Sequence, residues 1–187
     1  PLFIGTDDIW SGIVNLPFNF CFYGNTYSQI VVGANGLISF DMTYANAFCP
    51  WQFTETVPDA NLPLNSIFGA YHDLDPSMGG DINYAILGTA PCRTFVVNYN
   101  NVPHYSCDCS IFGDCNTTTQ QIVIYETTNI IDVYVLNKET CGSWNSGNAV
   151  IGIQDATGAN GLTPPGRNTG PWTASNEAWR FTPDGIP

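Results

Sequence analysis

The chain has 187 residues, 44% of them hydrophobic, and its sixteen acidic residues against four basic ones give a net charge of −12 at pH 7. This balance excludes nucleic acid as a partner, because phosphate backbones repel an acidic surface, and no apolar run is long enough for direct membrane insertion. A chain of this length can bury one hydrophobic core, so we predict a single domain over residues 1–187.

The stretch 16–40 predicts three short β-strands joined by two turns. The phenylalanines of FNFCF (18–22) recur at every second position, which places all three on one buried face of the first strand. A turn at 24–25 leads to the second strand, and Asn35-Gly36 predicts a type I′ hairpin turn before the third.

The rest of the chain reads as further strands around one long loop. Residues 41–65 are rich in aromatic residues and proline without a clear period, which indicates an ordered loop pinned by Cys49. Trp10 and Ile13 are the expected core contacts of an N-terminal strand. Alternating or β-branched runs predict strands at 8–14, 67–71, 82–86, 95–99, 121–127, 130–136, 149–154 and 177–182. About ten strands and no convincing helix predict an all-β, two-sheet β-sandwich with jelly-roll-like connections.

Seven cysteines in a β-rich chain indicate disulfides formed in an oxidising compartment. Strand order puts Cys107 and Cys141 at the same edge of a sheet, so this is the first predicted pair. The further predicted pairs are Cys109–Cys115 within the 103–118 loop and Cys21–Cys49, which leave Cys92 unpaired. Because the sequence starts at Pro1 and not at methionine, we interpret it as a segment excised from a longer, multidomain exported protein.

Two groups of motifs resemble a known family. The pattern F-x-F-x-FYG-x-x-Y followed by NG-x-x-x-F, between Phe18 and Phe40, resembles the extracellular nidogen-like β-domains. The longer run IFGAYHDLDPSMGGDINY, APCRTFVVNYNNVPHYSC, QIVIYETTNIIDVYVLNKETCGSWNSGNAVIGIQDATG, GRNTGPW and EAWRFTPDG resembles a domain of large Bacteroidota surface proteins. In that family the domain precedes Ig-like or PKD-like repeats and a gliding-motility-associated or type 9 secretion region.

The resemblance implies export across the outer membrane and residence at the cell surface or beyond it. Its implied partners are the other domains of the same surface protein, and it implies no known chemistry. The chain departs from the family pattern at Cys109 and Cys115, which look like an added pair.

An acidic turn, HDLDPSMGGD, follows the strand predicted at 67–71. Asp73, Asp75 and Asp81 could supply oxygen ligands to calcium, which is the predicted cofactor. The alternative is that these aspartates only cap backbone N–H groups around the turn. A third interpretation makes Asp73 and Asp75 the acid and base of a glycosidase, but such carboxylates normally flank a cleft from different elements.

Two polar loops carry exposed-looking aromatic residues suited to stacking on sugars. Trp144 and Asn145 lie in SWNSG, and Arg167, Asn168 and Trp172 lie in GRNTGPW. They are the predicted contacts for a glycan or other surface ligand, unless the tryptophans plug the end of their own sandwich.

Catalytic signatures are sparse. The set His104, Cys107, Cys109 and Cys115 could be drawn as a zinc site, but its spacing is unusual and an exported setting favours disulfides. No G-x-S-x-G or H-E-x-x-H motif occurs. We therefore predict a non-enzymatic, extracellular module that works in adhesion, gliding motility or surface filament architecture. The alternative is a carbohydrate-binding module attached to a secreted enzyme.

Overall fold

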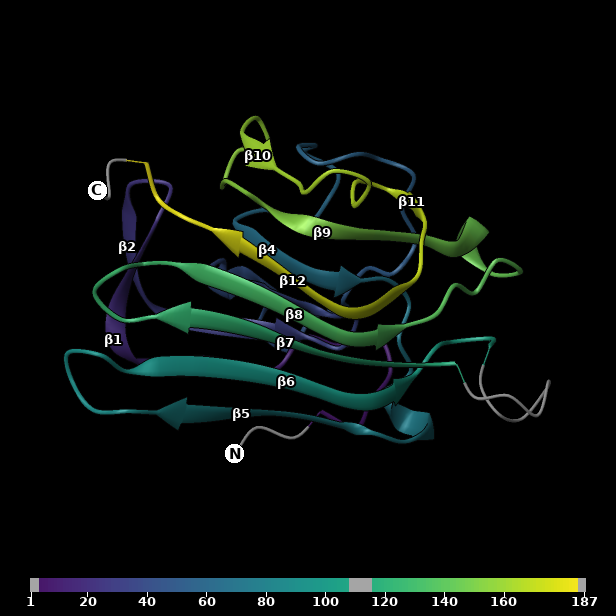
Figure 1. The fold of residues 1–187 in the computed structure, drawn as a ribbon, viewed down its shortest axis with the longest axis horizontal. Coiled ribbons are helices and arrows are strands. Elements are labelled where there is room, and N and C mark those ends of the chain that lie inside the picture. Colours follow the sequence, from purple (N-terminus) through teal and green to yellow (C-terminus); the bar gives the residue numbers. More distant parts are fainter. Residues whose placement is uncertain (1–3, 108–115, 185–187) are drawn as a thin grey trace.

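The computed structural model describes residues 4–107 and 116–184. It confirms the all-β, two-sheet architecture (Figure 1). One sheet has the order β1 (Val14–Phe22), β2 (Asn25–Gly33), β3 (Leu37–Ser39), β4 (Ser66–Tyr71), β9 (Asn148–Gln154) and β10 (Gly161–Leu162), with β11 (Gly170–Pro171) also paired to β9. The other has the order β12 (Ala174–Phe181), β8 (Ile131–Lys138), β7 (Thr117–Tyr125), β6 (Thr94–Pro103) and β5 (Asp81–Leu87). The described residues also form short 3-10 segments, which are η1 (Met42–Tyr44), η2 (Pro76–Met78) and η3 (Asn145–Gly147).

The main core lies between the two sheets. The phenylalanines of β1 all point into it, as their alternation predicts, and Phe20 is fully buried. Phe95 of β6 and Ile122 of β7 meet them from the other sheet. Each fully buried side chain of this size contributes about 1.5–3 kcal/mol, so this interior holds the two sheets together.

A second hydrophobic cluster covers the outer face of the larger sheet. The long loop 41–65 lies there, and Phe53 stacks on Tyr71 of β4 with ring centroids 4.7 Å apart. Cys49 is fully buried in the same cluster. The loop is therefore ordered as predicted, and packing of its apolar side chains holds it in place.

One polar side chain crosses the main core and fixes the end of β4. Gln120 of β7 accepts a hydrogen bond from the Ala70 N–H and donates one to the Ala70 carbonyl at 3.1 Å. Gly69 leaves room for it, because a Cβ at that position would lie 2.4 Å from Gln120 Oε1. This contact positions the chain just before it enters the acidic turn.

The N-terminal segment and the turns differ from the prediction. Residues 8–14 do not form a strand; Ile9 and Trp10 make single bridges to Phe48 and Gly33, and β1 begins at Val14. Trp10 is buried as expected, but Ile13 is 49% exposed, because the segment crosses the edge of the sheet without joining it.

Both predicted hairpin turns are displaced or altered. The first has positive φ at Tyr23 and Gly24, one residue earlier than expected. At the second, only Gly36 has positive φ, so this turn is not type I′. Asn35 instead turns its side chain inward.

The disulfide Cys107–Cys141 is present, as predicted, with 5.9 Å between the two Cα atoms. The predicted pair Cys21–Cys49 is wrong: Cys21 is exposed, Cys49 is buried, and both are free thiols. Cys21 pairs with Thr26 at one end of β2, whereas the Cys49 sulfur lies against Gly33 at its other end. Seven residues of strand span roughly 23 Å, far beyond disulfide reach. Cys92 is free, and the predicted pair Cys109–Cys115 lies outside the described residues.

Candidate functional site

Three carboxylates from distant parts of the chain meet at one end of the sandwich. Asp7 and Asp8 come from the N-terminal segment and Asp73 from the connection after β4; one oxygen of each lies within 4.8 Å of the others. Asn35 aligns the two segments, because its side chain donates to Asp8 Oδ1 at 3.0 Å and accepts from the Leu74 N–H at 2.9 Å. We call Asp7, Asp8 and Asp73 the aspartate cluster.

Asp73 is the most buried member of the aspartate cluster, at 6% exposure. Its Oδ2 accepts a hydrogen bond from the indole Nε1 of Trp144 at 2.7 Å. Within the described residues, its Oδ1 and the Oδ1 of Asp7 are buried and have no hydrogen-bond partner. Burial is the main cause that raises the pKa of Asp73 to about 7; the Trp144 bond opposes it, and the charges of Asp8, Asp7 and Asp75 add to it.

Asp7 and Asp8, the two members from the N-terminal segment, also have raised pKa values. Burial, then the charges of Asp8 and Asp75, raise the pKa of Asp7 to about 6. Burial also raises the pKa of Asp8, although its bond from Asn35 acts in the opposite direction. Asp7, Asp8 and Asp73 therefore share one region of space in which burial and neighbouring negative charge oppose their ionisation.

The sequence-predicted metal residues only partly belong to this cluster. Asp75 lies close to it but caps η2, accepting from the Ser77 N–H at 2.9 Å and from the Ser77 hydroxyl. Asp81 is exposed at the start of β5 and belongs to no such group of ligand atoms among residues 4–107 and 116–184. The capping alternative thus holds for Asp75, while Asp73 finds different partners from those predicted.

Sequence reasoning missed Asp7 and Asp8. The adjacent pair of aspartates is a visible signal, but Asp8 falls within the strand predicted at 8–14, and nothing in the sequence connects either residue with Asp73. Their contact with Asp73 depends on Asn35, whose buried connecting role follows from tertiary structure alone.

Beside Asp73 lies a buried polar group that resembles an active site by its shifted pKa values. His72 and His104 both contact the Thr118 hydroxyl through Nε2, at 3.0 and 2.8 Å. Burial, then repulsion from the Lys138 ammonium, lowers the pKa of His104 to about 3, and burial first and then His104 and Lys138 lower that of His72 well below its usual range. Both rings are neutral at pH 7.

Lys138 is 1% exposed and donates through Nζ to the Trp172 carbonyl at 2.7 Å. Burial is the main cause that lowers its pKa to about 7. The cavity lined by His72, Asp73, Lys138 and Trp144 has a volume of about 10 Å³. Such a space holds about one water molecule and no substrate.

The zinc alternative is wrong for this group. The sulfur of Cys107 is bonded to Cys141, and His104 Nε2 is occupied by Thr118. Cys109 and Cys115 fall outside the described residues.

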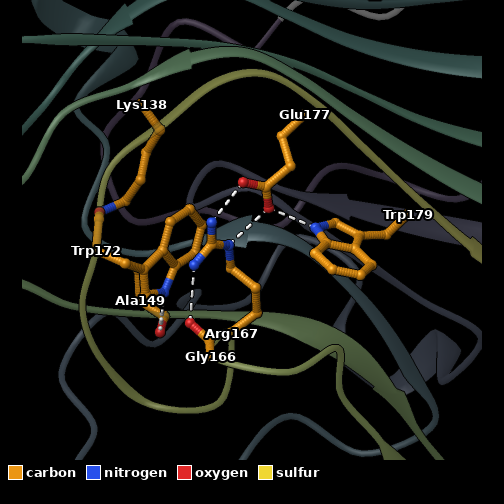
Figure 2. Close-up of polar contacts among 7 residues, drawn as sticks. All are labelled: Lys138, Ala149, Gly166, Arg167, Trp172, Glu177 and Trp179. Carbon is orange, nitrogen blue, oxygen red and sulfur yellow. Dashed lines mark hydrogen bonds and ion pairs between the residues drawn. The ribbon is translucent and has the colours of Figure 1, made fainter.

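The predicted glycan contacts around Trp172 serve the interior instead (Figure 2). Trp172 is only 8% exposed, its Nε1 donates to the Ala149 carbonyl at 2.9 Å, and the Arg167 guanidinium lies 4.7 Å from its ring centroid. Arg167 Nε also donates to Glu177 Oε1 at 2.6 Å, and Trp179 donates to the same carboxylate. The prediction that Trp172 offers an exposed stacking face is therefore wrong; it closes the end of its own sandwich.

The other residues predicted to contact a glycan also make contacts within the protein. The Asn168 side chain bonds both the N–H and the carbonyl of Val57, each at 2.9 Å. Asn145 donates to the Trp51 carbonyl at 3.2 Å, and Trp144 stacks against Trp51 with ring centroids 5.4 Å apart. Trp144 keeps part of its surface in solvent, so glycan contact there stays a prediction.

The structure is therefore a disulfide-bonded β-sandwich, and the titratable groups whose pKa values are shifted lie buried at one end of it. The chain belongs to the NIDO-related (nidogen-related) family, whose model matches residues 2–183. The nidogen-like resemblance is confirmed, and the link to Bacteroidota surface proteins stays a prediction. Comparison with curated proteins and with solved structures finds no match. NIDO-related domains occur in extracellular proteins. In residues 4–107 and 116–184, the structure contains no helix of the length and apolarity that a membrane crossing requires.

Proposed function

We propose that this chain is a non-enzymatic module of an exported bacterial surface protein, working in adhesion or in the architecture of a surface filament. Membership of the nidogen-related family supports the extracellular setting, and the disulfide between Cys107 and Cys141 is suited to an oxidising compartment. Its neighbours are further domains of the same protein, exported across the outer membrane by type 9 secretion in a gliding-motility context.

The observation that carries the non-enzymatic part is the packing around His72, His104 and Lys138. These residues have the shifted pKa values that often mark active sites. They bond internal partners, however, and the cavity beside them has room for a water molecule only. Their shifts follow from burial, as expected for a structural polar core.

Bead attachment tests the adhesive part. Polystyrene beads coated with the chain should attach to one another, or to a mucin-coated surface, more strongly than beads coated with the heat-denatured chain. Attachment no better than that of the denatured chain contradicts adhesion. Turnover of a panel of chromogenic glycosides that is lost in the His104→Ala variant contradicts the non-enzymatic assignment.

A groove elsewhere on the molecule favours carbohydrate binding as a second candidate function. It has a volume of about 700 Å³ and is lined in part by Tyr23, Asn129, Ile153, Asn160 and Leu162. Tyr23 is 38% exposed and Leu162 is 58% exposed, so an aromatic ring and apolar surface face solvent beside side-chain amides. Pockets of this size accommodate small ligands, and aromatic faces stack on sugar rings.

A glycan array distinguishes the two candidates. If the groove binds sugars, Tyr23→Ala should abolish array binding while Trp144→Ala leaves it intact. Binding lost in Trp144→Ala alone would restore the sequence-predicted site, and an array without any signal would remove the carbohydrate function.

A further inference from the structure

Two carboxylate oxygens in the aspartate cluster are buried without a partner. Asp73 is more than nine-tenths buried, and its Oδ1 receives no donor from residues 4–107 or 116–184. The Oδ1 of Asp7 is in the same state. A buried carboxylate oxygen normally accepts hydrogen bonds, because leaving it unpaired costs its desolvation free energy. An unpaired oxygen at the meeting point of three carboxylates is suited to bind a cation.

The chain supplies no such charge from its own side chains. It has four lysine and arginine residues in all, every one of them in the described part of the chain. Arg93 pairs with Glu126 at 2.6 Å, Arg180 with Asp132 at 2.8 Å, and Arg167 with Glu177. The Lys138 Nζ donates a hydrogen bond to the Trp172 carbonyl. His72 and His104 both direct Nε2 to the Thr118 hydroxyl and not to the cluster.

We propose that Asp7, Asp8 and Asp73 bind a calcium ion that joins the N-terminal segment to the connection after β4. Oxygen atoms within 4.8 Å of one another can share a single ion with ligand distances of about 2.3–2.6 Å. The cluster offers carboxylates and neither imidazole nor thiolate, which selects a hard cation over zinc. Calcium accepts several carboxylates in a flexible shell, whereas magnesium keeps most of its waters.

The ligands come from elements that are already held in place. Asn35 fixes both Asp8 and Leu74, and the Trp144 indole orients Asp73 through Oδ2, leaving Oδ1 for the ion. Asp75 adds negative potential from the cap of η2. Calcium binding here does not depend on whether the chain works as an adhesive module, because it stabilises the fold in either case.

Calorimetric titration of the chelator-treated chain with calcium chloride tests the site. We expect one ion per chain with a dissociation constant of roughly 0.1–1 mM, the range of extracellular calcium modules, and weaker binding of magnesium. Asp73→Asn keeps an acceptor for Trp144 but removes one charge, and should weaken calcium binding by about tenfold or more. Asp7→Asn should do the same and serves as the second variant if Asp73→Asn does not fold.

The matched control is Asp81→Asn, which removes an equal charge from the same acidic loop at an exposed position outside the aspartate cluster. It should leave the affinity unchanged within about twofold, since salt screens an exposed charge that is not a ligand of the ion. The proposal is overturned by the absence of calcium binding, or by binding that Asp7→Asn and Asp73→Asn do not weaken. Equal weakening in Asp81→Asn would show diffuse attraction to the acidic surface and would also overturn it.

Discussion

Two loops of the larger sheet each bury an aspartate, and they treat its charge in opposite ways. Asp155 follows β9 and is 9% exposed, while Asp73 follows β4 and is 6% exposed. Asp155 accepts from the N–H and hydroxyl of Thr157, from the Ala159 N–H, and from the backbone and side chain of Asn160. Burial would raise its pKa, but the bonds from Asn160 and Thr157 outweigh burial and lower it to about 2.

Asp73 accepts a hydrogen bond from one donor, whereas Asp155 accepts hydrogen bonds from five donor groups. The Trp144 indole satisfies one oxygen, and the nearby charges of Asp8, Asp7 and Asp75 reinforce the effect of burial. The comparison teaches that burial does not by itself decide the state of a carboxylate. A loop that supplies its own donors completes the site internally, whereas a loop that gathers further carboxylates leaves a charge for a cation.

The largest expected effect comes from the covalent link beside Asp73, which the Asp155 loop lacks. The Cys107–Cys141 disulfide spans 34 residues, so the double variant Cys107→Ser/Cys141→Ser should lower the free energy of unfolding by about 3–4 kcal/mol. Trp144 would also be less firmly positioned, because its backbone N–H bonds the carbonyl of residue 141, which the disulfide no longer anchors. Urea denaturation followed by fluorescence measures the change.

The control for the disulfide variant is Cys92→Ser, which alters an exposed free thiol. It should change stability by less than about 0.5 kcal/mol. A loss below about 1 kcal/mol in the double variant would show that packing, and not the disulfide, holds this end of the sandwich.

Removing the Asp155 carboxylate, which is hydrogen-bonded within its own loop, should have the next largest effect on stability. Asp155→Ala leaves several N–H groups of the 155–160 turn without their acceptor, and we expect a loss of about 2–3 kcal/mol. Thermal unfolding with and without calcium measures it, and the loss should be the same in both conditions. A loss that calcium restores would mean that the Asp155 loop is an ion site as well.

The fold was largely predictable because its signals are local and periodic. The alternating phenylalanines of β1 and the apolar runs of β6 to β8 place their side chains toward one interface in the structure, as a period of two requires. Ile13 and the Asn35 turn were predicted wrongly because their surroundings are set by tertiary contacts. The strand edge at which the N-terminal segment crosses is not encoded within that segment.

The site was predictable only in part, for the same reason. The acidic turn motif HDLD points to Asp73 as a candidate ligand, and the Cys107–Cys141 disulfide follows from strand order. Asp81 lies outside the aspartate cluster because η2 and the following glycines lead the chain away to β5, which begins at that residue. Trp172 looked accessible in a polar loop, yet the folded chain buries it between two cationic side chains.

A smaller effect of opposite sign is expected at the unsatisfied carboxylate. At pH 8 without calcium, Asp73→Asn should raise the free energy of unfolding by about 1–2 kcal/mol, because it removes a charge that burial and neighbouring carboxylates oppose. Its amide can also donate toward Asp7. Chemical denaturation measures the change, and about 10 mM calcium should shrink the difference by about 1 kcal/mol, because the unmodified chain binds the ion about tenfold more tightly. A destabilised, calcium-responsive variant would contradict this account of Asp73.

The smallest expected effect is the pH dependence of that difference. The pKa of Asp73 is raised to about 7 and that of Asp7 to about 6, so the folded chain retains protons that the unfolded chain has already released. The stability that these groups contribute is therefore fully present below about pH 4 and is lost as pH rises through about 6–7.

Other groups titrate in the same range with the opposite sign. His72 and His104 have lowered pKa values, so their contribution falls as pH drops below about 6.5, and Lys138 acts similarly above pH 7. Because the unmodified chain and Asp73→Asn share these residues, the difference between the two proteins isolates Asp73. In calcium-free buffer the advantage of Asp73→Asn should shrink from its pH 8 value to less than about 0.5 kcal/mol at pH 5. An advantage that stays constant across this range would assign the effect to the new amide's hydrogen bonds and not to relief of charge.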